Sequence, residues 1–142
     1  MSEKTRPDLD LSSHCACGAV AARFTGRPLT MMLCSCHDCQ KATGTGHSTL
    51  ALVKASDLMI EGPTRSFTVT ANSGHEVTRH FCPDCGTPIV GQPAQYPDLR
   101  LLPAGLFGDS DWFAPRSVIF HRSHHDWDVL PDIPAFNTYK ES

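Results

Sequence analysis

Short runs of alternating hydrophobic and polar residues recur along the chain, and prolines and glycines separate them. β-Branched and aromatic residues are frequent in these runs, of which Glu76–Phe81 is one example. This alternation is typical of strands that expose one face to water. We therefore predict strands at Val20–Thr25, Leu29–Leu33, Ser48–Val53, Ser66–Thr70, Glu76–Phe81, Pro88–Gly91, Leu99–Leu102 and Ser117–His121.

Helical patterns are scarce, because 11 prolines and 10 glycines interrupt the sequence. The one segment that favours a short helix is Asp38–Thr43. Strands without intervening helices favour antiparallel sheets, so we predict a mainly β fold. A chain of 142 residues fits one domain of ordinary size. We expect this domain to span residues 14–136, with loose termini at 1–13 and 137–142.

The charge and hydropathy of the chain argue against several classes of protein. Its formal net charge is −3, whereas domains that bind nucleic acid usually carry a basic patch. No run of 18 apolar residues is present, so we expect no membrane span. The first ten residues contain no apolar stretch that resembles a signal peptide. We therefore expect a cytoplasmic protein, in which thiols stay reduced.

Seven cysteines fall into three clusters and none is isolated: Cys15 and Cys17; Cys34, Cys36 and Cys39; and Cys82 and Cys85. The odd number and the reducing compartment argue against a disulfide framework. A thioredoxin-type redox pair at Cys82 and Cys85 is a weak alternative, because the Gly-Thr-Pro that follows opposes a helix. Metal binding is the better interpretation of such closely spaced thiols.

We assign the two outer clusters to one four-cysteine site, formed by Cys15, Cys17, Cys82 and Cys85. A structural zinc site needs four ligands in a tetrahedron, and thiolates suit it. Glycine follows the second cysteine of each pair, at Gly18 and Gly86, and allows a sharp turn that brings backbone amides near the sulfurs. Such a site would connect the early part of the chain to its middle.

The middle cluster offers three thiols, Cys34, Cys36 and Cys39. Three protein ligands and one open position are typical of a catalytic zinc. Two alternatives stay open at this point: a histidine that closes the site, or no second metal. His47 or His80 would have to reach the site from elsewhere, and ligation by His37 would be strained between its neighbours.

The order of these clusters resembles the family of glutathione-dependent formaldehyde-activating enzymes and centromere protein V. The likeness includes Gly18-Ala19-Val20 after the first pair and the segment from Asp38 to Gly44. It continues through Arg79-His80-Phe81-Cys82-Pro83-Asp84-Cys85-Gly86-Thr87-Pro88. It then covers Val118 to His121, Trp127, Leu130-Pro131 and Pro134-Ala135-Phe136, so it extends over roughly residues 14 to 136.

This resemblance implies a β-tent fold, in which antiparallel sheets surround a four-cysteine zinc site with one or two short helices. It implies two Zn²⁺ ions per chain: a structural one in the outer group and a second, open one at Cys34, Cys36 and Cys39. The activity implied is a carbon–sulfur lyase that interconverts glutathione plus formaldehyde with S-hydroxymethylglutathione. Glutathione is therefore the expected small-molecule thiol.

Three thiolates around one Zn²⁺ leave a net charge of about −1, which favours capture of a thiol over activation of water. His37, Asp38 and His47 are candidate proton carriers, each with a surface role as the alternative. Glutathione carboxylates would need cations, for which the candidates are Lys41, Arg79, Arg100 and Arg122. The group His121, His124, His125 and Asp126 is a second candidate cluster, with a solvated turn beside a packed Trp127 as the alternative.

A second class of function also fits the sequence. A zinc-stabilised β domain can bind a protein partner or a thiol ligand without turnover. A homodimer through an exposed sheet edge is a further expectation, because unpaired edge strands readily pair with another chain.

Overall fold

The computed structural model describes residues 8–71 and 74–139. Its strands and one α-helix follow each other as β1 (Leu9–His14), β2 (Ala21–Gly26), β3 (Thr30–Cys34), α1 (His37–Thr43), β4 (Ser48–Lys54), β5 (Leu58–Glu61), β6 (Arg65–Thr70), β7 (Glu76–Phe81), β8 (Pro88–Pro93), β9 (Leu99–Pro103) and β10 (Ser117–Ile119). Short 3-10 turns η2, η3 and η4 lie at Ala55–Asp57, Ala104–Phe107 and His121–Ser123. None of the helices in the described ranges is long and apolar enough to span a membrane.

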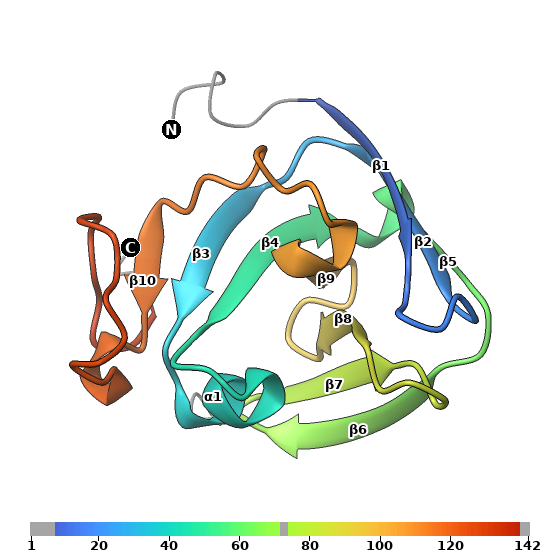
Figure 1. The fold of residues 1–142 in the computed structure, drawn as a ribbon. Helices are drawn as coiled ribbons and strands as arrows, with labels where there is room; N and C mark the ends of the chain where they lie inside the picture. The colour runs from blue at the N-terminus through green and yellow to red at the C-terminus, as the bar shows by residue number, and fades with distance from the viewer. Residues whose placement is uncertain (1–7, 72–73, 140–142) are drawn as a thin grey trace.

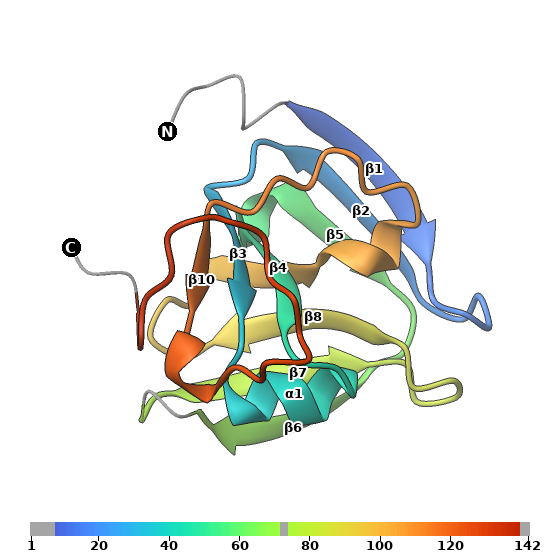
Figure 2. The ribbon, with the colours of Figure 1, turned by 60° about the vertical axis from the view of Figure 1, so that its left-hand side comes forward.

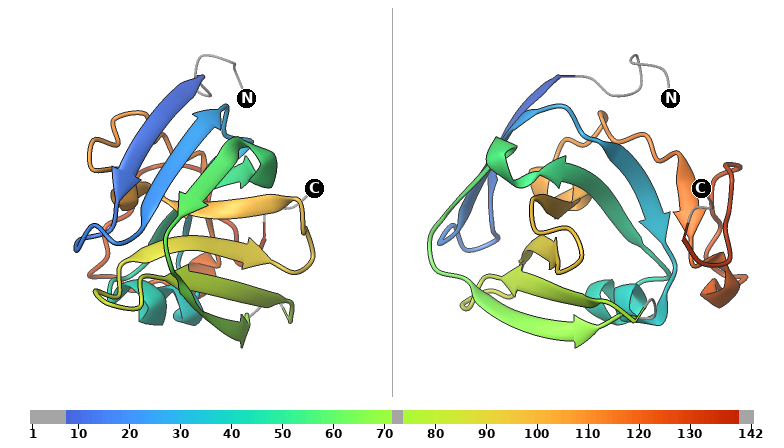
Figure 3. Two further views of the ribbon diagram at one scale, coloured as in Figure 1. Left: turned by 90° about the vertical axis from the view of Figure 1, so that its right-hand side faces the viewer. Right: turned by 180° about the vertical axis from the view of Figure 1, so that it is seen from behind.

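The strands form two sheets. One has three strands in the order β1-β2-β5, and the other has seven in the order β10-β3-β4-β9-β8-β7-β6. Figure 1 shows the larger sheet curling from β10 and β3 round to β6 and β7, with the smaller sheet on the side away from β10. The strands of the two sheets cross at a steep angle (Figure 3, left). The fold is mainly β, as predicted.

The main hydrophobic core joins the two sheets. Five fully buried side chains form its centre: Val20, just before β2, Phe24 of β2, Met31 of β3, Ile89 of β8 and Leu102 of β9. Burying side chains of this size stabilises the fold by roughly 1.5–3 kcal/mol each. The alternation of buried and exposed residues in β2, where Ala22 and Phe24 are buried, confirms the pattern read from the sequence.

Every strand predicted from the sequence is present, and the differences lie mostly at the ends. The helix α1 begins one residue earlier than predicted, at His37. The last strand was predicted to reach His121 but ends at Ile119. The reason is that Phe120 adopts a left-handed backbone conformation with φ of 54°, and η4 begins at His121.

Two strands were not predicted, and one of them corrects the expected domain boundary. Strand β5, at Leu58–Glu61, pairs with β2. Strand β1, at Leu9–His14, pairs with β2 over its whole length, from Leu9 opposite Gly26 to His14 opposite Ala21. Residues 9–13 therefore belong to a sheet and not to a loose terminus, because their backbone groups and half-buried leucines need the neighbouring strand. Residues 1–7 lie outside the described part.

The pairing is antiparallel except at one end of the larger sheet, where β10 runs parallel to β3. The chain after β10 then folds back along that strand. The Phe136 N–H donates to the Val118 carbonyl over 2.9 Å, and the Phe120 N–H donates to the Thr138 carbonyl over 2.9 Å. The Tyr139 ring packs edge-on against the Phe120 ring with centroids 5.1 Å apart.

These contacts correct the second predicted boundary, because residues 138 and 139 are held against the domain. Figure 2 shows the chain after η4, in orange-red to red, passing beside α1 and then over β10. We call residues 121–135, which lie between β10 and the returning chain, the C-terminal strap. The predicted loose residues 140–142 lie outside the described part.

Candidate metal centres

The first cysteine group links the two sheets. Cys15 and Cys17 lie in the turn after β1, and Cys82 and Cys85 lie in the turn between β7 and β8. Their four sulfur atoms lie within 4.8 Å of one another. Cys15 and Cys82 are buried, whereas Cys17 and Cys85 are exposed. Because one turn belongs to each sheet, an ion held by all four sulfurs would connect the sheets.

The two cysteine turns share one backbone design. The N–H of the first cysteine in each turn donates to the carbonyl five residues later, over 2.9 Å from Cys15 and 3.0 Å from Cys82. Gly18 and Gly86 follow the second cysteines with φ values of +84° and +78°. Other residues rarely adopt this region, so the glycines predicted to shape these turns do so.

Backbone amides point at the buried sulfurs of this group. The Val20 N–H donates to Cys15 Sγ over 3.3 Å, and the Asp84 N–H donates to Cys82 Sγ over 3.4 Å. Such donors stabilise a thiolate, which is the form in which cysteine binds metal.

Thr87 connects the two turns through its side chain. Its Oγ1 accepts a hydrogen bond from the Ala16 N–H over 3.1 Å and lies 3.1 Å from Cys85 Sγ. The hydrogen bond from the Thr87 hydroxyl lowers the pKa of Cys85 to about 5. The pKa of Cys17 instead rises to about 12, because the effects of Cys15 and Cys82 outweigh the Ala19 N–H that lowers it. Without metal, the group therefore holds both thiolates and thiols.

The spacing of the sulfurs fits a tetrahedral ion. Cys17 Sγ lies 3.6 Å from Cys15 Sγ and 3.6 Å from Cys82 Sγ. Sulfurs bound at about 2.3 Å around a tetrahedral zinc lie about 3.8 Å from one another. The group can therefore hold a metal ion with little rearrangement.

The second group lies where β3 turns into α1. Cys34 ends β3, Cys36 caps the N-terminus of α1, and Cys39 lies in the first turn of that helix. The Cys39 N–H donates to Cys36 Sγ over 3.3 Å, so the sulfur takes the role that a serine oxygen often has at this position. The three sulfurs lie within 4.8 Å of one another, and the side chains are only 5%, 5% and 8% exposed.

A small apolar cluster surrounds these thiols. Ile119 and Phe120, at the end of β10, are buried against the three cysteines, and Met32 and Leu50 pack beside them. The Ser35 N–H donates to the Ile119 carbonyl over 3.0 Å and ties the bend between β3 and α1 to β10. The group thus lies in a mostly dry environment.

Without metal, the three thiols share their protons. Hydrogen bonds from Cys34 and then Cys39 lower the pKa of Cys36 to about 2, and the hydrogen bond with Cys36 raises the pKa of Cys34. For Cys39, Cys34 lowers the pKa, but Cys36 and burial outweigh it and raise it to about 11. One thiolate with two thiol donors is therefore the neutral-pH state, and a metal ion would replace the two remaining protons.

No further His, Asp or Glu joins the three sulfurs within the part of the chain that the structure describes. His37 is exposed on α1. His47 Nδ1 lies 2.7 Å from Asp128 Oδ2, and His80, on β7, lies 3.4 Å from Gln92 Oε1 through its Nε2. None of the three histidines considered from the sequence therefore completes the group.

Two polar contacts hold the C-terminal strap against the second group. Gln40 of α1 donates from Nε2 to the carbonyls of Ser35 and Ser123, over 2.9 and 3.0 Å. Its Oε1 lies 2.9 Å from His125 Nε2. The pair of His47 and Asp128 adds a second link, and both side chains are mostly buried, at 24% and 13% exposed.

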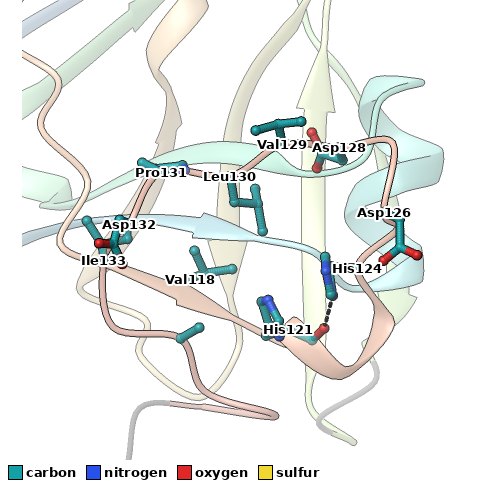
Figure 4. A pocket seen from close by; sticks show the side chains of 11 residues that line it. Val118, His121, His124, Asp126, Asp128, Val129, Leu130, Pro131, Asp132 and Ile133 are labelled. Atoms are coloured by element: carbon teal, nitrogen blue, oxygen red, sulfur yellow. Dashed lines mark hydrogen bonds between the residues drawn. The ribbon is translucent and has the colours of Figure 1, made fainter.

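A pocket of about 470 Å³ lies between β10 and the strap (Figure 4). It is lined by Val118, His121, His124, Asp126, Asp128, Val129, Leu130, Pro131, Asp132, Ile133 and Ala135. The two residues between Val118 and His121 in the sequence, Ile119 and Phe120, pack on the three cysteines. In Figure 4, Asp126 lies on the side of the pocket next to α1.

Two of the three histidines predicted to cluster before Trp127 line this pocket. His121 and His124 line it with their rings stacked 3.8 Å apart, whereas His125 bonds to Gln40 instead. One alternative assumed a packed Trp127, and this is wrong. The side chain is 68% exposed, and its ring stacks on the His125 ring with centroids 5.1 Å apart.

The cations considered for glutathione carboxylates do not gather at the pocket. Lys41 is exposed on α1, and the Arg122 guanidinium lies 5.7 Å from the Phe120 ring centroid. Arg100 donates to the carbonyls of Pro97 and Leu99, and Arg79 lies on β7. No Lys or Arg is among the described residues that line the pocket.

Sequence reasoning missed the residues that support the cysteines from outside the motifs. Asp128 and Ser48 stand in no pattern that points to the thiols. Thr87 and Gln40 belong to the segments on which the family resemblance was based, but nothing in the motif indicated their hydrogen bonds.

Comparison with known proteins identifies the family. The family model described as glutathione-dependent formaldehyde-activating enzyme matches residues 10–123. Among curated proteins, none matches the chain. The crystal structure of a protein from Rhodobacter sphaeroides has a TM-score of 0.56 and 18% sequence identity, and the likeness covers 88% of this chain and 99% of that one. The structural likeness supports the fold, and the family match shows that the chain belongs to the glutathione-dependent formaldehyde-activating enzyme family.

Proposed function

We propose that this protein is a zinc-dependent carbon–sulfur lyase that makes and breaks the adduct of a thiol and an aldehyde. Glutathione and formaldehyde, with S-hydroxymethylglutathione as the adduct, are the pair that the family implies. The observation that carries this proposal is the group of three buried thiols, Cys34, Cys36 and Cys39, which no fourth side chain joins in the described ranges.

Zinc is the metal we propose for both groups. Soft thiolate ligands select zinc over the harder divalent cations. Cys15, Cys17, Cys82 and Cys85 would hold a structural ion with a full set of ligands, and the middle three cysteines a second ion with one position open to substrate. When bound there, zinc would supply a coordination position that favours the deprotonated form of an incoming thiol.

The reaction itself needs one proton to move. The thiol sulfur forms a bond to the aldehyde carbon, the π electrons of the carbonyl go to its oxygen, and the proton lost by the thiol ends on that oxygen. Formaldehyde reacts with thiols unaided, so most of the gain would come from holding the two partners together. Ile119 and Phe120 bury the thiols in apolar surroundings, which would limit competition from water.

His47 is the side chain to which we assign the proton. Asp128 Oδ2 lies 2.7 Å from His47 Nδ1, and a proton held on Nδ1 by this contact would leave Nε2 as the acceptor. His47 lies in the loop that joins α1, whose first turn carries Cys39, to β4. The other two candidates fit less well: His37 is exposed, and Asp38 carries a buried carboxylate oxygen without a partner in the described part of the chain.

The test is NMR exchange spectroscopy of glutathione and formaldehyde with the zinc-loaded protein. We expect the protein to raise the rate at which the hydroxymethyl adduct forms and breaks, and Cys36→Ser to leave the rate at its uncatalysed value. Metal analysis of both proteins should give two zinc ions for the unchanged chain and one for the variant. An uncatalysed rate with two zinc ions bound would instead favour a binding module without turnover.

A further inference from the structure

Ser48, the first residue of β4, has a buried hydroxyl with no hydrogen-bond partner in the described part of the protein. The residue is only 6% exposed. A serine hydroxyl can donate one hydrogen bond and accept others, and buried hydroxyls normally do so. An unpartnered hydroxyl therefore points to a partner that is missing from the metal-free protein.

The position of Ser48 in the sheet shows which group it faces. Ser48 lies opposite Cys34 in the register between β3 and β4. Side chains two residues apart on a strand share a face, so Ser48 lies on the same side of β4 as Leu50. Leu50 packs against the cluster of Cys34, Cys36 and Cys39. The Ser48 side chain thus faces the three thiols.

The apolar neighbours of Ser48 offer its hydroxyl no strong hydrogen-bond acceptor. The cluster consists of the cysteines with Ile119, Phe120, Met32 and Leu50, and none of these apolar side chains carries a strong acceptor. Ser48 lies opposite Cys34, and it is also close enough to Cys39 for its hydroxyl to lower the pKa of that thiol, after the larger effects of Cys34, Cys36 and burial.

We propose that Ser48 donates a hydrogen bond to the Cys39 thiolate when the three-cysteine site holds its metal, and so acts as a positioning residue for that ligand. A metal-bound thiolate has lost its proton and can only accept, so the hydroxyl must be the donor. The buried, unpartnered hydroxyl of Ser48 and its place on the face that carries the thiols are the observations behind this assignment.

This inference rests on the proposed function and adds to it by naming the residue that tunes its metal ligand. Three thiolates leave excess negative charge at the site, and a donor aimed at one sulfur draws part of that charge away. The metal then binds an incoming thiol more readily than a bare three-thiolate site would.

The experiment substitutes Co²⁺ for the metal in the full-length protein and compares Ser48→Ala with the unchanged chain. Loss of the hydrogen bond makes the Cys39 thiolate a stronger electron donor, so we expect the sulfur-to-cobalt charge-transfer band to move to longer wavelength. We also expect the affinity of the three-cysteine site, measured against a competing chelator, to fall about tenfold, as is typical when a group that orients a metal ligand is removed.

Two further variants make the test specific. Ser13→Ala removes a serine of β1 in the smaller sheet, whose hydroxyl donates to the Leu106 carbonyl, and should change neither the band nor the affinity. Ser48→Thr keeps a hydroxyl and should restore both values toward those of the unchanged protein. A Ser48→Ala spectrum and affinity equal to those of the unchanged chain would overturn the inference, as would a Thr variant that behaves like the Ala variant.

The readouts also separate this inference from the proposed activity. Band position and affinity do not depend on turnover. An inactive protein with a shifted band in Ser48→Ala would therefore contradict the lyase proposal alone. An active protein with an unshifted band would contradict the role of Ser48 alone.

Discussion

At the scale of single residues, the seven cysteines divide into groups with different surroundings. Cys82 belongs to the group that joins the two sheets, whereas Cys36 caps one helix. Serine is among the best N-cap residues, so Cys36→Ser removes a metal ligand but keeps the cap. The same substitution at Cys82 removes a ligand from the link between the sheets and gives no such replacement.

We therefore predict unequal losses of stability in these two variants. Cys36→Ser should lower the free energy of unfolding by less than about 1 kcal/mol. Cys82→Ser should lower it by more than about 3 kcal/mol, because the ion that Cys82 helps to hold connects the two sheets, whereas the ion at Cys36 is held within one short segment. Denaturant unfolding followed by circular dichroism measures both. Equal losses would contradict this division between a linking group and a second group.

The thiolates also predict a pH dependence for the metal-free protein. The pKa of Cys85, lowered to about 5 by Thr87, lies below the value of 9.0 for an unperturbed cysteine. A lowered acid pKa contributes stability that is complete above pH 9 and is lost as the pH falls through about 5. Cys36, with its pKa lowered to about 2 chiefly by Cys34, acts in the same direction over this range.

The free energy of unfolding of the protein without metal should therefore rise between about pH 5 and pH 9. Thr87→Val removes the hydroxyl that lowers the Cys85 pKa, and we expect the rise to be smaller in this variant. Denaturant midpoints at several pH values, with chelator present throughout, provide the comparison. Parallel pH profiles for the two proteins would show that Thr87 does not set the Cys85 pKa.

At the scale of elements, the strap is positioned by a close contact with the loop after α1. A Cβ atom at Gly46 would come within 2.5 Å of Asp128 Cγ, so this glycine allows Asp128 to reach His47. Along the chain, the link of the strap to Gln40 lies before Gly46, and its link to His47 lies directly after Gly46. The position of the strap therefore depends on α1 and on the loop that precedes β4.

Gly46→Ala should displace Asp128 and separate it from His47. We expect a loss of about 1–3 kcal/mol, the usual effect of overpacking. We also expect a lower rate of adduct exchange, because His47 loses the carboxylate that orients it. Gly105→Ala is the matched control: a Cβ there meets nothing within 4 Å, and we expect neither property to change. An active, stable Gly46→Ala protein would argue against a role for the His47 pair.

At the scale of the whole molecule, the strap and β10 line an open pocket to which none of the cysteines contributes. Asp126, Asp128 and Asp132 line it, and no basic side chain does among the described residues, apart from the two histidines. Such a lining favours a positively charged group on the ligand. In glutathione this group is the free α-ammonium, and not the carboxylates for which the sequence suggested cations.

Blocking that ammonium should therefore reduce the effect of the protein. We expect N-acetylglutathione to show a rate of formaldehyde exchange at least about tenfold less enhanced than glutathione, which corresponds to about 1.4 kcal/mol. The comparison uses NMR exchange at equal thiol concentration, with the uncatalysed rate subtracted for each thiol. Equal enhancement for both thiols would show that the glutathione ammonium does not bind in this pocket.

Much of the fold could be predicted because its signals are local. Strand β7 was predicted with its observed limits, since its alternating residues and flanking loops lie within one short segment. Strands β1 and β5 were missed, although Leu9 and Leu11 alternate with polar residues. Strand β1 lies in the segment taken as a loose terminus and β5 has only four residues, and both are defined by their pairing with β2.

The sequence by itself determined the three cysteine clusters, because cysteines so close along the chain can be brought to one point by a single turn. It did not determine what surrounds the thiols. Ser48 faces the three thiols through the register of β3 and β4, Asp128 reaches His47 through the strap, and Thr87 bonds to Ala16 in the facing turn. Those contacts join residues far apart in sequence, and only the packing of the two sheets and the strap decided which of them meet.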